Sequence, residues 1–117
     1  MALKNLKSGV FDQYEVLAAS GTVVFPEQGT KTVFITKGTA AAVTLTAPTA
    51  GTHDNCRIVF VATTAAAHTV TATTIGFNAG NTTTDVGTFG GAIGDGFEAI
   101  AYNGEVYTAN VVNVTFA

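Results

Sequence analysis

The amino-acid sequence predicts an all-β fold, an antiparallel β-sandwich or barrel of the jelly-roll type, with an N-terminal arm. Short runs of Thr, Val and Ala alternate in period 2 and are separated by Gly, Pro and Asn turns, which is typical of half-buried strands. Towards the C-terminus these runs recur at roughly ten-residue spacing, as in sandwiches and barrels. Only 11% of the residues are charged, against about 25% in ordinary soluble domains. We therefore expect much of the surface to contact other chains.

Residues 1–19 differ from the rest of the chain, and we expect a single β domain over residues 20–117. The apolar positions of the first segment fit neither strict period 2 nor a sustained helical stripe. Two interpretations remain open: a strand or short helix packed on the domain's own core, or an extended arm that lies on a neighbouring protein. The apolar side chains concerned are Leu3, Leu6, Val10, Phe11, Tyr14 and Leu17.

The strand signals become regular after residue 20. Val33 and Ile35 lie on one face of their run, and Val43 and Leu45 alternate with threonines in the next run. β-Branched residues in this pattern indicate strands with one buried face. The runs cover residues 22–25, 31–36 and 41–46, and the long turn 48–55 follows them.

Residues 57–63 are apolar on both faces, which predicts a central strand. Further strands are expected over residues 68–73 and 86–89, with a Gly/Asn/Thr loop over residues 75–83. The glycine-rich segment 90–96 is predicted to be a tight turn in which Asp95 bonds the backbone. A phosphate-binding loop would need a helix after it, whereas the residues that follow this segment have the pattern of a strand.

The dipeptide Asn103-Gly104, set between two alternating runs, is the clearest local signal. Asn-Gly favours a type I′ hairpin turn, because both central residues of that turn need a positive φ. One face of the hairpin can close the core, and we expect the other face, with Ile100, Tyr102 and Tyr107, to contact a second chain. The two-residue loop sets the register Tyr102 with Glu105, Ile100 with Tyr107, Glu98 with Ala109, and Phe97 with Asn110.

Composition argues against several functions. The net charge is −3 with five scattered basic residues, so no basic patch is available for nucleic acid. Cys56 is the single cysteine and lies in an apolar run, so we expect a buried thiol and no disulfide framework. No stretch has the length of a membrane span or of the apolar core of a signal peptide. We expect a protein that is made in the cytoplasm and stays soluble until it assembles.

Nothing in the sequence has the spacing of a catalytic or metal-binding group. His53 lies in a turn and His68 opens a strand, and neither has a spaced set of further ligands or a positioned nucleophile. The carboxylates are spread singly, whereas glycoside hydrolysis needs a facing pair. We expect no enzyme activity and no cofactor.

Several segments together resemble small structural proteins of tailed bacteriophages, in particular capsid decoration (cement) proteins and head-fibre-type proteins. The likeness covers residues 46–107 and carries no catalytic motif. The segments are 46–55, 58–71, 77–80, 85–96 and 101–107.

This resemblance implies a β-rich virion protein, often trimeric, that binds the outside of the capsid shell and staples neighbouring capsomers. The expected partners are the major capsid protein and further copies of the chain. Because residues 1–45 lie outside the resemblance, we expect the capsid contact in the N-terminal segment, at Leu3, Leu6, Val10, Phe11 and Tyr14. The alternative is a head-fibre or tail-associated adhesin domain that binds a host glycan or receptor.

Overall fold

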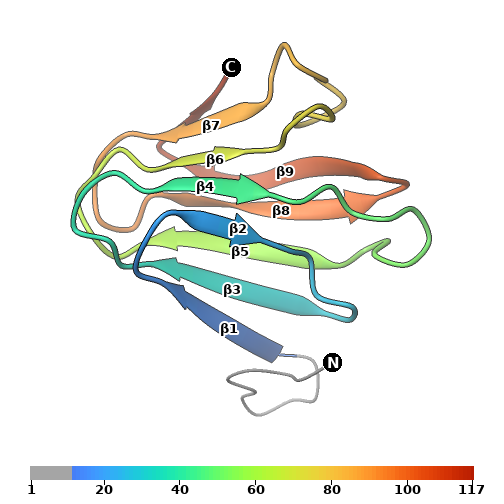
Figure 1. Cartoon of the computed structure of the whole chain (residues 1–117), viewed down its shortest axis with the longest axis horizontal. Helices are drawn as coiled ribbons and strands as arrows, with labels where there is room; N and C mark the ends of the chain where they lie inside the picture. Colours follow the sequence, from blue (N-terminus) through green and yellow to red (C-terminus); the bar gives the residue numbers. More distant parts are fainter. Residues whose placement is uncertain (1–11) are drawn as a thin grey trace.

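The structure is a computed structural model, and it describes residues 12–117 (Figure 1). This part of the chain contains ten strands and no helix, so the predicted all-β class is confirmed. The strands are β1 (Asp12–Leu17), β2 (Gly21–Val23), β3 (Thr30–Ile35), β4 (Ala42–Leu45), β5 (Arg57–Ala62), β6 (Thr69–Thr71), β7 (Val86–Phe89), β8 (Gly96–Tyr102), β9 (Glu105–Val112) and β10 (Val114–Phe116).

The strands form two five-stranded sheets that pack as a sandwich. Sheet I has the order β1-β3-β5-β8-β9, and sheet II has the order β10-β7-β6-β4-β2. The first six strands alternate between the sheets, so each strand returns to its sheet in the same direction as the one before. The pairs β1/β3, β3/β5, β2/β4 and β4/β6 are therefore parallel. This corrects the prediction of antiparallel sheets, because only the strands from β7 onward add antiparallel pairings.

Part of the expected arm belongs to the sandwich. Residues 12–17 form β1, the edge strand of sheet I, which pairs in parallel with β3. For these residues the interpretation as a strand of the domain holds, and residues 1–11 lie outside the described residues. The inward-facing carboxylate of Glu15 forms an ion pair of 3.1 Å with the buried Lys31. A charge directed inward on an edge strand discourages pairing with a foreign strand.

The core lies between the sheets and is built from alternating strand positions. Val33, Ile35, Val43 and Leu45 are all buried, as the period-2 pattern predicts. Phe97 lies at the centre of an aromatic cluster in which ring centroids are 4.9 to 6.3 Å apart, mostly edge to face. Such pairs add about 0.5–1.5 kcal/mol each beyond the area they bury. The other members of the cluster are Phe60, Phe77, Phe89 and Phe116.

The β8/β9 hairpin confirms the predicted turn and most of its register. Asn103 and Gly104 have φ values of 52° and 80°, as a type I′ turn requires. The expected pairs hold as far as Glu98 with Ala109, after which the register shifts and Gly96 pairs with Val112. The predicted pair of Phe97 with Asn110 is therefore wrong. Asn110 has a φ of 50° and occupies a β-bulge, which places one extra residue on β9.

The turn before β8 is fixed by the buried carboxylate of Asp95. Its Oδ2 accepts hydrogen bonds from the backbone N–H groups of Gly91 and Ala92, at 3.0 and 2.9 Å. The side chain of Asn113, where the chain passes from β9 to β10, donates to both oxygens at 3.1 Å. The hydrogen bond from the backbone N–H of Ala92 is the largest cause that lowers the pKa of Asp95, and the bonds from Asn113 and Gly91 lower it further. The prediction that Asp95 bonds the backbone of a tight turn is confirmed.

Candidate interaction surfaces

The outer face of sheet I is a broad apolar surface, which we call the apolar face. Side chains alternate between the two faces of a strand, and paired residues on neighbouring strands point to the same face. The outward-facing positions of the five strands therefore form one continuous surface. Val16, Tyr102, Tyr107 and Val112 are 53%, 60%, 39% and 55% exposed, which is high for large apolar side chains. The face comprises Tyr14, Val16, Phe34, Val59, Val61, Ile100, Tyr102, Tyr107 and Val112.

The apolar face also carries polar groups, among them Thr30 and Thr32, which pair with Arg57 and Val59 of β5. Arg57 forms an ion pair of 3.5 Å with Glu98, which also accepts a hydrogen bond of 3.2 Å from Asn110. The carboxylate of Glu105, opposite Tyr102, has one buried oxygen, Oε1, without a hydrogen-bond partner among the described residues. An unpaired buried carboxylate oxygen is costly, because it has lost its water without gaining a donor.

A shallow groove of about 170 Å³ crosses the apolar face above β8. Gly96 is one of its lining residues, and no side chain fits at this position because a Cβ would lie 1.9 Å from the carbonyl oxygen of Phe60. Val59 and Val61 line one side, and Val112 lines the other. The groove can therefore receive an apolar side chain from a partner.

The outer face of sheet II has a different chemistry, and we call it the threonine face. None of its strands contains a charged residue. Parallel pairing places Thr22 beside Thr44 and Thr44 beside Thr71. Hydroxyl groups keep such a surface hydrated although it carries no charge. Its members on the strands are Thr22, Thr44, Thr69, Thr71, Thr88 and Thr115.

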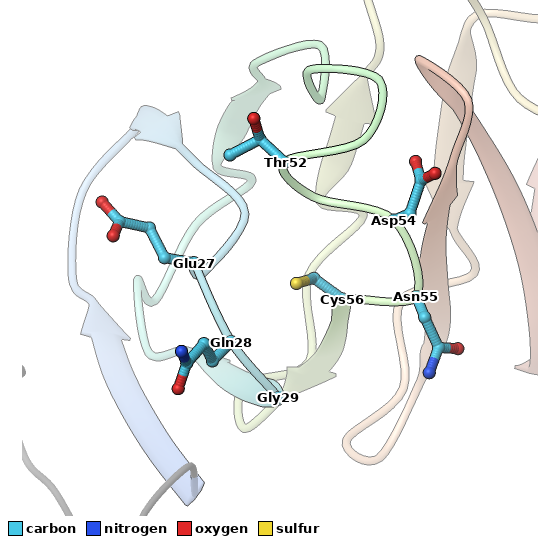
Figure 2. A pocket seen from close by; sticks show the side chains of 7 residues that line it. All are labelled: Glu27, Gln28, Gly29, Thr52, Asp54, Asn55 and Cys56. Atoms are coloured by element: carbon cyan, nitrogen blue, oxygen red, sulfur yellow. The ribbon is translucent and has the colours of Figure 1, made fainter.

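A polar pocket of about 430 Å³ lies at one end of the sandwich, between the loop before β3 and the loop before β5. Figure 2 shows Glu27 and Gln28 on one side of it and Thr52 on the other. Burial raises the pKa of the Cys56 thiol in its wall, so this thiol stays protonated at neutral pH and is a poor nucleophile. The expectation of a buried cysteine is confirmed. The remaining lining residues are Gly29, Asp54 and Asn55.

His68 is fully buried, and both of its ring nitrogens have partners. Nδ1 accepts a hydrogen bond of 3.0 Å from the backbone N–H of Ala41, so the neutral ring carries its proton on Nε2, 3.1 Å from Oγ1 of Thr64. Burial lowers the pKa of His68. Within residues 12–117 no three His, Cys, Asp or Glu side chains are grouped so that they could hold a metal ion.

The structure brings together three of the residues that the sequence singled out. Ile100, Tyr102 and Tyr107 lie on the apolar face, and Tyr14 lies on the same face at the opposite edge, 6.1 Å from Phe34 between ring centroids. The other expected capsid contacts, Leu3, Leu6, Val10 and Phe11, lie outside the described residues.

The polar pocket was not predicted, and neither were the surface positions of Val16, Phe34, Val59 and Val61. The one sequence signal for Val59 and Val61 is the two-sided apolar pattern of β5, which predicts a central strand. That position is confirmed, because β5 lies between β3 and β8. A central position in sheet I does not bury the outer face of β5, because sheet II packs against the inner face only.

Comparison with protein-family models, curated proteins and solved structures gives no match to this chain. Across residues 12–117 the structure has no helix that is long and apolar enough to cross a membrane.

Proposed function

We propose that this protein is a virion structural protein that binds the outer surface of a bacteriophage capsid and cements neighbouring capsomers. The observation that carries the proposal is the pair of unlike broad faces, one apolar and one lined with threonine hydroxyls. A rigid sandwich with one broad face suited to contact with another chain and one suited to water fits a component of a protein assembly that stays exposed to the solvent.

The resemblance of residues 46–107 to capsid decoration proteins supplies the kind of partner, the major capsid protein. The expected capsid contact, the N-terminal segment, joins the sandwich at a defined place. Asp12 pairs with Thr30, immediately after Gly29 in the wall of the polar pocket. We propose that the end of the sandwich that carries Asp12 and the long turn 48–55 faces the shell.

We also propose that the protein acts as a homo-oligomer, with a trimer favoured. Several modest contacts with the shell then act together, and linked sites raise the overall affinity by ~10²–10⁴ without any new contact. A cement needs this property because it must hold more than one capsomer at once. The proposed location is the exterior of the virion, after synthesis in the host cytoplasm.

The proposal is tested by co-sedimentation with purified capsids that lack a decoration protein. We expect the protein to pellet with these capsids at a fixed ratio to the major capsid protein, and to stay in the supernatant with whole host cells. Pelleting with the cells alone would contradict the proposal and favour the adhesin.

The polar pocket favours this second candidate, a domain that binds a host glycan. Glu27, Gln28 and Asn55 offer carboxylate and amide groups, which hydrogen-bond sugar hydroxyls. Among the described residues, none that lines the pocket is aromatic and could stack on a sugar ring. If this candidate is right, Gln28→Ala and Asn55→Ala will each reduce binding to host cells, whereas Thr88→Ala on the threonine face will leave it unchanged.

A further inference from the structure

We propose that Asn103 is a modification site, at which the folded protein loses a side-chain amide without the help of an enzyme. The backbone N–H of Gly104 loses its proton, its nitrogen attacks Cγ of Asn103, and the side-chain amino group leaves with a proton as ammonia. The new N–Cγ bond closes a five-membered imide. Water then adds to either carbonyl of the imide and opens it to aspartate or to isoaspartate. This site is independent of the proposed capsid partner.

The peptide group that joins Asn103 to Gly104 is not held by hydrogen bonds. Among the residues that the structure describes, neither the carbonyl of Asn103 nor the N–H of Gly104 has a partner, and the exposed side chain of Asn103 has none. No atom lies within 4 Å of a Cβ built on Gly104. The preceding peptide group is fixed instead, because the N–H of Asn103 donates a hydrogen bond of 2.8 Å to Asp54. The peptide group between Asn103 and Gly104 can therefore rotate while the rest of the hairpin stays in place.

This rotation brings the attacking nitrogen to the side chain. In a type I′ turn the ψ of the first central residue is about 30°, which directs the next nitrogen away from Cβ. In the type II′ turn, which also fits a two-residue hairpin, this ψ is about −120° and the nitrogen eclipses Cβ, as the five-membered ring requires. The φ of Asn103, 52°, suits both turns. Gly104 changes its φ from 80° to about −80°, and glycine accepts both values.

Asn103 is the one asparagine in the sequence that a glycine follows. The others precede Leu, Cys, Ala, Thr or Val, whose side chains crowd the nitrogen that would attack. Other side-chain amides are also engaged in hydrogen bonds: Asn78 donates to Thr108 at 3.0 Å, and Asn113 donates to Asp95 at 3.1 Å. Both the nitrogen and the amide are therefore accessible at Asn103.

The modification changes the point where the hairpin meets the long turn 48–55. It makes the net charge of −3 more negative by one. The new carboxylate belongs to the residue whose N–H contacts Asp54, and two carboxylates at one turn repel each other. Isoaspartate also adds a methylene to the backbone, whereas the two-residue loop fixes the register of the hairpin. The modified hairpin is therefore less stable than the parent hairpin.

Peptide mapping by mass spectrometry, after the folded parent protein has stood for days at pH 7 and at pH 9, tests this site. We expect a gain of one mass unit in the peptide that contains residue 103, with isoaspartate as well as aspartate among the products. The gain should be faster at pH 9, because the attacking nitrogen must lose its proton. Asn103→Gln should reduce the gain to background, since a longer side chain has to close a six-membered ring. The matched control is Asn81→Gln in the loop 75–83, which is also exposed and should leave the gain unchanged.

An unchanged mass of the folded parent at pH 9 would overturn the inference, and so would a gain that occurs only in urea. Gain at another asparagine would do the same. Aspartate at residue 103 without isoaspartate would contradict the imide. The measurement on the parent needs no substitution, so it decides the matter if Asn103→Gln fails to fold by circular dichroism.

Discussion

The carboxylate of Asp54 accepts a hydrogen bond of 2.8 Å from the backbone N–H of Asn103, which lies 49 residues further along the chain. The same oxygen, Oδ1, accepts a second bond of 3.1 Å from the N–H of Gly51. One side chain thus joins the long turn 48–55 to the tip of the β8/β9 hairpin. Both elements belong to the segments that resemble capsid decoration proteins.

Asp54→Ala should destabilise the protein by about 1–2 kcal/mol, because two backbone donors lose a charged acceptor in a half-buried place. Asp54→Asn should cost less, since an amide oxygen can still accept. Urea unfolding at pH 7 measures both. Asp85→Ala is the control, because its carboxylate makes no hydrogen bond within residues 12–117. An Asp54→Ala variant that unfolds like the parent would show that the link is not stabilising.

Gly104→Val should destabilise the hairpin, because Gly104 has a φ of 80°, where a β-branched residue is strongly disfavoured. Gly104→Asn should be milder, since Asn tolerates this region. The matched control is Gly38→Val: no atom lies within 4 Å of the added Cβ, and φ is not in the left-handed region. We expect thermal melting to rank the variants Gly38→Val, Gly104→Asn, Gly104→Val from most to least stable. Equal melting of both Gly104 variants and the parent would contradict the type I′ assignment.

Stability should fall as the pH drops below about 6.5, the ordinary pKa of histidine. Burial lowers the pKa of His68 in the folded protein, so the unfolded chain takes up a proton in this range that the folded chain does not. The expected slope approaches about 1.4 kcal/mol per pH unit for one proton. It ends where the pH reaches the lowered pKa of the folded state.

Urea unfolding between pH 8 and pH 5.5 measures this slope. His68→Gln should be less stable but should lose most of the slope, whereas His53→Gln should retain it. A parent protein with no slope in this interval would contradict the buried neutral state of His68.

Deleting residues 2–11 should leave a folded β domain and abolish capsid binding. The deletion spares β1, so sheet I keeps its edge strand and the ion pair of Glu15 with Lys31. Circular dichroism and capsid co-sedimentation measure the two parts of this prediction. For comparison, deleting residues 2–18 removes β1 and should destabilise the domain as well. Unchanged capsid affinity of the shorter deletion would place the contact elsewhere.

Local sequence signals predicted the local parts of the fold. The Asn-Gly dipeptide fixes both the hairpin turn and the side-chain pairs near it, because the turn type allows one register. The bulge at Asn110 was not predicted, because the alternating pattern of β9 does not indicate an extra residue there. Parallel pairing was also missed: alternation of buried and exposed residues is the same in parallel and antiparallel strands.

The sequence does not distinguish strand β1 from an extended arm, and the reason is physical. Its inward positions include Gln13, which pairs with the buried Lys31, and Glu15, which forms an ion pair with Lys31. In the sequence alone both look like surface residues. The hairpin half of the apolar face was predicted because Ile100 and Tyr107 follow from the turn. The other half depends on which strands are neighbours, and the polar pocket depends on two loops that meet in space.

Cryo-electron microscopy of undecorated capsids incubated with this protein tests the central claim most directly. We predict new density at symmetry-related positions on the outer surface of the shell, with each sandwich attached at the end that carries residues 12 and 48–55. A shell that stays bare at saturating protein concentration would contradict the account.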